Sequence, residues 1–278
     1  MLKVRIFFIL SVFLLSAVST GCQPNPKSVK QTYSKETVAN DIIELCKREY
    51  KREPKVWLIN DTVWVYVPFE SLIDKNMEPT KEVSDTLNDI VLASSRVVLS
   101  MNPRPKFLVI AASDIKEYGI DYLTISYIPD LIKYRLDAIS RDEFLRRHIT
   151  RIKESFDAMS DSEGKHLEKT DIKLEDFMSE QMASRINLKF AEDPLLKDHF
   201  KVNKVSVKFK DEAFEITTDI QQLTQPKAPV DIQEEIAKVV SSVVRAYNFS
   251  NFALAQIENV ATGEKTVLSS RRLREPTN

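Results

Sequence analysis

Three aspartates are the residues whose type and placement could support acid–base or metal chemistry. Asp114, Asp121 and Asp130 fall around the ends of two apolar stretches that we expect to be strands. Neighbouring carboxylates can transfer protons or bind cations. Aspartates beside strands also close turns and cap helices through backbone hydrogen bonds. We therefore predict turn and cap roles for all three, with an acid–base site as the alternative.

The three histidines, His148, His166 and His199, are widely separated in the chain. None has the H-E-x-x-H spacing of a metal site, and no serine lies in a glycine-flanked turn that would expose a nucleophile. Counting residues leaves a Ser–His–Asp arrangement open. We predict that the histidines face solvent and that the chain binds no cofactor or metal, which favours a protein that is not an enzyme.

Five arginines lie in or near one region that we expect to be helical: Arg135, Arg141, Arg146, Arg147 and Arg151. Acidic residues are mixed among them, which is typical of a solvated helix face with ion pairs four residues apart. A patch that binds an anionic lipid headgroup or polymer is the alternative. The formal net charge of −1 gives no general reason to expect nucleic acid as a partner.

Glycine is scarce, with four among 278 residues. Phosphate-binding loops and nucleophile elbows need glycine for close backbone approach and strained turns. Because no such motif is present, the sequence argues against a familiar nucleotide-binding or hydrolase site.

The first 22 residues combine a charged head, an apolar core and a small-residue cleavage site. Lys3 and Arg5 precede the apolar run 6–18, and Gly21 is followed by Cys22. The apolar run is shorter than the ~20 residues of a helical membrane span, so the pattern indicates a secretory signal. Together with the cysteine, it resembles the signal peptide of a bacterial lipoprotein.

That resemblance implies cleavage between Gly21 and Cys22, lipidation of Cys22, and anchoring to a membrane of the cell envelope. In a Gram-negative cell, the sorting habit of the class favours the outer membrane on its periplasmic side, since Gln23 follows the cysteine. The only other cysteine is Cys46, so no disulfide within the chain is expected. Its place on the apolar face of a predicted helix indicates a core residue.

Hydrophobic periodicity and turn residues predict a series of short elements. We expect helices at 37–51, 80–100, 129–156 (one or two), 174–190 and from 231, and strands at 56–59, 62–67, 107–112, 122–127, 205–209, 213–217, 252–257 and 266–270. The fold class is α+β, with two units that each pack a helix on a small, mainly antiparallel sheet.

The predicted segments are a signal peptide (1–21), a lipidated tether (22–36), a first unit with a helical extension (37–156), a mobile linker (157–173), a second unit (174–270) and a tail (271–278). The order helix, hairpin, helix, hairpin occurs twice. Offsets of 149 residues for the central helices and 145 for the following strands suggest an internal repeat.

The first sheet is apolar on both faces, because Trp57, Trp64 and Tyr66 lie on the face opposite the central helix. We expect the 129–156 helices to cover them, with an exposed aromatic surface as the alternative. The resulting hypothesis is a non-catalytic envelope lipoprotein that acts in protein interaction or envelope assembly. An envelope hydrolase acting on cell-wall material and a binder of an apolar ligand are the alternatives.

Overall fold

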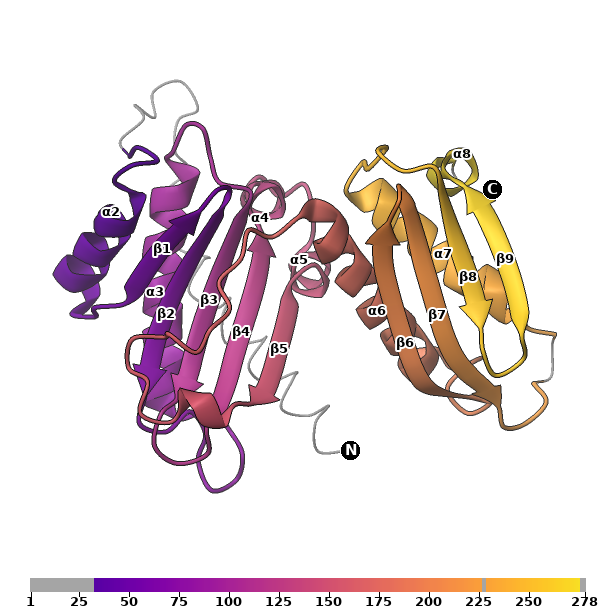
Figure 1. The fold of residues 1–278 in the computed structure, drawn as a ribbon, viewed down its shortest axis with the longest axis horizontal. Coiled ribbons are helices and arrows are strands. Elements are labelled where there is room, and N and C mark those ends of the chain that lie inside the picture. Colours follow the sequence, from indigo (N-terminus) through magenta and orange to yellow (C-terminus); the bar gives the residue numbers. More distant parts are fainter. Residues whose placement is uncertain (1–32, 227–228, 276–278) are drawn as a thin grey trace. The chain divides into compact units, whose positions relative to one another are not determined.

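The computed structural model describes residues 33–226 and 229–275. The chain forms two compact units, of which the first ends at Ile172 and the second begins at Lys173. Each unit packs helices on its own mainly antiparallel sheet, so the predicted α+β class with two units is confirmed (Figure 1). The predicted cleavage and lipidation at Gly21 and Cys22 lie outside the described residues.

The first unit is built on a five-stranded sheet of order β1-β2-β3-β4-β5. Its elements are α2 (Val38–Leu45), η2 (Cys46–Tyr50), β1 (Lys55–Ile59), β2 (Thr62–Phe69), α3 (Lys81–Leu99), β3 (Phe107–Asp114), β4 (Ile120–Tyr127), α4 (Ile128–Arg135), α5 (Arg141–Arg146), β5 (Ile149–Glu154) and η3 (Phe156–Ala158). All neighbouring strands are antiparallel except β2 and β3, which are parallel and joined through α3.

The main core of this unit lies between the sheet and the pair α2 and α3. Ile42 of α2 and Ile90 of α3 meet Val63, Val65 and Ile110 of the sheet, all essentially inaccessible to solvent. The predicted caps hold as well: the Thr80 hydroxyl accepts a hydrogen bond from the Val83 N–H at the start of α3.

The segment from 156 to 172, which we call the strap, crosses the opposite face of the first sheet (Figure 1). This face carries Trp64 and Tyr66, which are 3% and 0% exposed. The sequence predicts a mobile linker at 157–173 and a helical cover from 129–156. Both expectations are corrected: the strap itself is the cover, because its backbone carbonyls accept hydrogen bonds from the two aromatic side chains.

The 129–156 region, predicted to be helical throughout, ends in a strand. It contains α4 and α5, and then β5, which pairs with β4 along its free edge. The Ser140 hydroxyl caps α5 as expected, accepting from the Glu143 N–H. A strand forms after α5 because the exposed edge of β4 offers unpaired backbone groups, and Ile149 lies opposite Ile125.

The second unit is built on a four-stranded sheet of order β6-β7-β8-β9. Its elements are α6 (Leu174–Glu192), β6 (Phe200–Lys210), β7 (Ala213–Gln222), α7 (Ile232–Ala246), β8 (Leu254–Asn259), β9 (Glu264–Ser269) and α8 (Ser270–Arg274). The sequence predicts a loose tail from 271. Instead, the first residues of this tail form α8, which is held against the unit by the buried side chain of Leu273.

The order and directions of the strands recur between the units. The inner strands β2 and β3 pair in parallel from Thr62 and Phe107, as β7 and β8 do from Ala213 and Leu254. The helix caps Thr80 and Asp231 differ by 151 residues (231 − 80), and the next strands by 147 (254 − 107). Both offsets exceed the predicted ones by two residues, and the expected difference of four between them is kept.

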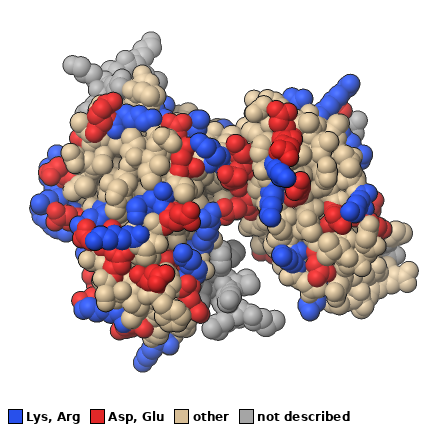
Figure 2. Space-filling model, viewed as in Figure 1, with Lys and Arg blue, Asp and Glu red and all other residues tan. Residues whose placement is uncertain are grey.

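No helix among the described residues is both long enough and apolar enough to cross a bilayer. Figure 2 shows acidic and basic side chains interspersed over the visible face of each unit, with no large area of one sign. On the faces seen in Figure 2, this mixture does not form a basic stripe.

Candidate functional site

The strap holds the most closely connected polar network among the described residues, centred on His166. Three contacts place it on the sheet. Trp64 Nε1–H donates to the Thr170 carbonyl at 2.9 Å, and Tyr66 O–H donates to the Asp161 carbonyl at 2.7 Å. Near its end, the backbone N–H of Ile172 donates to the Thr62 hydroxyl at 2.9 Å. The buried aromatic donors are thus satisfied by backbone oxygens.

Gly164 lets the strap approach the sheet closely. Its φ is +67°, a left-handed conformation that side chains disfavour, and a Cβ built there would lie 2.8 Å from Cδ1 of Tyr66. Both the backbone conformation and the space therefore require glycine at this position. This contact brings the following residues, including His166, down onto β3 and β4.

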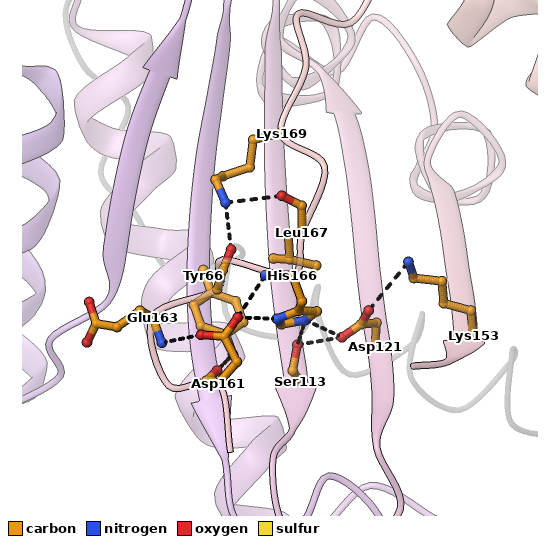
Figure 3. Close-up of polar contacts among 10 residues, drawn as sticks. Tyr66, Ser113, Asp121, Lys153, Asp161, Glu163, His166, Leu167 and Lys169 are labelled. Carbon is orange, nitrogen blue, oxygen red and sulfur yellow. Dashed lines mark hydrogen bonds and ion pairs between the residues drawn. The ribbon is translucent and has the colours of Figure 1, made fainter. Parts of the chain in front are cut away.

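His166 is held between two carboxylates (Figure 3). Its Nδ1 lies 2.6 Å from Oδ2 of Asp161, and its Nε2 lies 2.9 Å from Oδ1 of Asp121. The His166 backbone N–H also donates to Asp161 Oδ2 at 2.8 Å. Each ring nitrogen of His166 therefore has a carboxylate oxygen within hydrogen-bond distance. His166 thus bridges the strap to β4.

Ser113 and Lys153 complete the network. The Ser113 hydroxyl donates to Asp121 Oδ1 at 2.6 Å and lies 3.2 Å from Nε2 of His166. Lys153 Nζ, on β5, lies 3.6 Å from Asp121 Oδ2, which has no hydrogen-bond partner among the described residues. The side chains of His166 and Asp121 are 3% and 0% exposed.

The electrostatics of Asp161 follow from these contacts. Burial alone would raise the pKa of its carboxyl group. Hydrogen bonds from the His166 side chain and from the backbone N–H groups of His166 and Glu163 outweigh burial and lower the pKa to about 2. The carboxylate therefore stays ionised at neutral pH, where it holds the His166 ring in place.

Asp161, His166 and Ser113 contact one another in the same order as the acid, base and nucleophile of a catalytic triad. The environment of the serine, however, differs from that of a catalytic serine. A nucleophilic serine needs an accessible hydroxyl and a base whose second nitrogen is available to it. Ser113 is fully buried near the end of β3, and Asp121 both accepts the hydrogen bond from its hydroxyl and contacts Nε2 of His166. The geometry fits a structural clamp better than a nucleophile.

The predicted turn role of Asp114 is confirmed. Asp114 Oδ1 accepts hydrogen bonds from the backbone N–H groups of Lys116, Glu117 and Tyr118, and Oδ2 accepts one from Leu72 N–H. Asp114 therefore organises the β3–β4 turn. Asp121 pairs with Ser113 across β3 and β4, and successive strand residues point to opposite faces. Asp114 and Asp121 therefore do not converge, which argues against the alternative of an acid–base site built from these two carboxylates.

Asp130 lies in α4, where it forms a buried ion pair with Arg147. Arg147 Nη1 lies 2.8 Å from Asp130 Oδ1, and Arg147 Nε lies 2.7 Å from Glu143 Oε1. This pair joins α4 to α5. The expectation of one solvated arginine face is therefore wrong for Arg147, which is buried because its two carboxylates compensate for its desolvation. The other four arginines, Arg135, Arg141, Arg146 and Arg151, are exposed.

The prediction of solvent-facing histidines is wrong for His166 and His148. His148 lies edge-on to the Phe144 ring, and burial lowers its pKa to about 4. His199, in the second unit, is partly exposed and contacts the Thr224 hydroxyl through Nδ1 at 2.7 Å. Cys46 is buried in the main core as predicted, and burial raises the pKa of its thiol to about 12, which leaves it unreactive.

Sequence reasoning missed His166 because its partners come from β3, β4 and the strap, which are far apart in the chain. One signal was available: Asp161 and His166 flank Gly164, and a glycine in a polar segment can mark close backbone approach. Among the described residues, no group of three or more His, Cys, Asp or Glu side chains is arranged to hold a metal ion.

Comparison of the chain with family models, with curated proteins and with solved structures found no match. The functional argument therefore depends on the chain's own residues and their geometry. The strongest of these observations is the buried His166 network that fixes the strap to the first sheet.

Proposed function

We propose that the chain is a lipid-anchored protein of the cell envelope that acts without catalysis, through interaction with other envelope proteins. The anchor rests on the segment ending in Gly21 and Cys22. Each buried methylene of an acyl chain contributes about 0.8 kcal/mol to membrane binding, so several chains on one cysteine give a stable attachment.

One observation carries the non-catalytic part of the proposal. The groups best suited to chemistry are each engaged in holding the fold: Asp114 organises a turn, Asp130 pairs with Arg147, and His166 clamps the strap. Catalytic groups need access to a substrate, and these carboxylates and this ring are buried. The sheet of the second unit, by contrast, exposes polar side chains such as Glu215 and Thr217 on its outer face.

The anchor is tested by metabolic labelling with a palmitate analogue. The chain offers a matched control, because Cys46 is its only other cysteine. We expect labelling of the wild type and of Cys46→Ala, and loss of labelling in Cys22→Ala with release of the protein from the membrane fraction. Equal labelling of all three proteins would refute the anchor.

The non-catalytic role is tested with a fluorophosphonate probe, which labels activated serines. We expect no labelling of the wild type beyond that of Ser113→Ala. The hydrolase alternative is favoured by the Asp161–His166–Ser113 order of contacts. Labelling that is lost in both Ser113→Ala and His166→Gln would establish that alternative and overturn the proposal.

A further inference from the structure

A partly enclosed cavity of about 60 Å³ lies in the first unit, on the α3 side of the sheet. Val91 and Leu92 of α3, Leu108 and Ile110 of β3, and Leu131 and Phe144 of the α4–α5 pair contribute apolar walls. This site is on the opposite face from Trp64 and the strap. The aromatic face that suggested an apolar ligand from sequence is covered, whereas this cavity is not filled by the described side chains.

The α4–α5 pair forms a preorganised cover over the cavity. The rings of Tyr134 and Phe144 stack with centroids 4.4 Å apart and planes 5° from parallel, and His148 lies edge-on to Phe144. Arg147 joins the two helices through Asp130. Leu131 and Phe144 form a small apolar cluster beside the main core, and Leu99 at the end of α3 packs against both.

Charge at the cavity has one sign. Arg135 is the only Lys, Arg, Asp or Glu among the lining residues, and it is exposed, so it lies at the rim. Within the part of the chain that the structure describes, no carboxylate forms an ion pair with it, whereas the cover's Arg147 has two such partners. His148 also lines the cavity, and burial lowers its pKa to about 4, so it is uncharged at neutral pH.

An apolar cavity with one unpaired guanidinium at its rim matches a ligand with an apolar tail and an anionic head. We propose that this site binds a single-chain anionic amphiphile such as a fatty-acid carboxylate, with the tail in the cavity and the carboxylate on Arg135. A guanidinium binds a carboxylate through two parallel N–H···O bonds, which gives strength and orientation.

The volume limits the ligand. Cavities of about 150 Å³ bind benzene, so 60 Å³ takes the end of an alkyl chain, while the rest of a medium-length chain lies along the rim. A ten-carbon chain is therefore the natural probe. This inference goes beyond the proposed function and does not depend on the anchor, because every residue that it uses lies between Val91 and Thr150.

The test uses the full chain carrying Cys22→Ala in detergent-free buffer, so that no acyl chain on Cys22 competes with the probe. Sodium decanoate is titrated below its micelle concentration, and the methyl resonances of leucine and valine are followed by NMR. We expect saturable shifts at Leu92, Leu131 and Leu145, and none at Leu268, a buried leucine of the second unit. Absence of saturable shifts at the first three would overturn the proposal.

Variants then separate the two parts of the site. Arg135→Gln should weaken decanoate binding about tenfold and leave decanol binding unchanged, while Arg146→Gln, an exposed arginine that does not line the cavity, should change neither. Leu145→Trp fills the cavity and should abolish binding of both probes. Equal decanoate affinity in the two arginine variants would overturn the assignment of the headgroup, and binding retained in Leu145→Trp would overturn that of the tail.

Discussion

The two sheets share strand order, strand directions and a crossover helix. They differ in whether the face opposite that helix is covered. In the first unit, Tyr66 and Trp64 of β2 are buried beneath the strap. The equivalent positions of β7, counted from the paired starts at Thr62 and Ala213, are Thr217 and Glu215, which are exposed. The same backbone framework therefore supports a covered sheet or an open one, and side-chain pattern decides which.

The comparison also shows that a sheet can be covered without a second helix layer. The strap has little regular structure and few apolar residues, with Ala158 and Leu167 its buried ones. It compensates with backbone carbonyls that accept hydrogen bonds from the buried Trp64 and Tyr66 side chains, and with His166, which adds a contact to Asp121. The open sheet needs no such cover, because its outer face is polar.

The largest expected effect comes from removing the aromatic side chain beneath the strap. Tyr66→Ala leaves a cavity and should lower the free energy of unfolding of the first unit by about 3–5 kcal/mol. Thr217→Ala, at the equivalent exposed position, should change the second unit by less than about 0.5 kcal/mol. Both tryptophans, Trp57 and Trp64, lie in the first unit, so urea unfolding followed by tryptophan fluorescence reports that unit.

Hydrogen exchange by mass spectrometry measures the second unit in the same samples. If Tyr66→Ala does not fold, Tyr66→Phe keeps the ring and removes the hydroxyl with its hydrogen bond to the Asp161 carbonyl, with an expected loss of about 1 kcal/mol. Equal effects at Tyr66 and Thr217 would show that the strap adds nothing to the first sheet.

The next effect compares two glycines with left-handed backbones. Gly164→Ala meets the Tyr66 ring, whereas a Cβ at Gly263, in the β8–β9 turn, meets nothing within 4 Å. Both variants carry the backbone cost of about 1–2 kcal/mol. We expect Gly164→Ala to cost about 1–2 kcal/mol more than Gly263→Ala, because tight overpacking adds strain. Denaturant midpoints of the respective units give the difference, and equal costs would mean that the strap does not press on Tyr66.

The smallest expected effect comes from removing a charge, and it compares an aspartate of the strap with an aspartate on the open sheet. Asp161→Asn removes a carboxylate that accepts charge-assisted hydrogen bonds, and should destabilise the first unit by about 1–2 kcal/mol at pH 7. Asp219→Asn, on the open face of β7, should have almost no effect, since Asp219 is partly exposed and its side chain accepts a hydrogen bond from the Asn203 amide.

The pH dependence of this difference has a definite sign. The folded state lowers the pKa of Asp161 from 3.8 to about 2, so its stabilisation is complete above the unfolded value and is lost as pH falls through the folded one. The gap between wild type and Asp161→Asn should therefore be constant above about pH 4 and shrink toward pH 2. Charging of His148 at low pH acts on both proteins alike. A gap unchanged at pH 2 would contradict the assignment.

Much of the framework was predictable from sequence. The stripe of apolar residues and the Thr80 cap locate α3, and the Asp231 and Glu234 spacing locates α7. Apolar runs around Asn60 and Asp61 locate the first hairpin, and an alternating pattern locates the second. These features follow from local periodicity and capping, which act within a few residues. The order of the elements in the second half was predicted, whereas the parallel pairing of β7 with β8 was not.

The strap and β5 were not predictable in the same way. The strap has the polar composition of a linker, and its stability comes from backbone carbonyls meeting Trp64 and Tyr66, about a hundred residues earlier. β5 follows a capped helical turn, and only the edge of β4 makes it a strand. His166 acquires its partners through both events, so a reading of local patterns placed it in solvent.

The end of the strap has a mechanical consequence. Thr62, at the start of β2, contacts Asp171 and Ile172, and α6 begins at Leu174. A tension applied through the C-terminal unit would therefore reach the Thr62 contacts first and the His166 clamp only after they had given way. The strap would detach from β2 starting at its C-terminal residues. A small force would therefore break only the Thr62 contacts and leave the His166 hydrogen bonds intact.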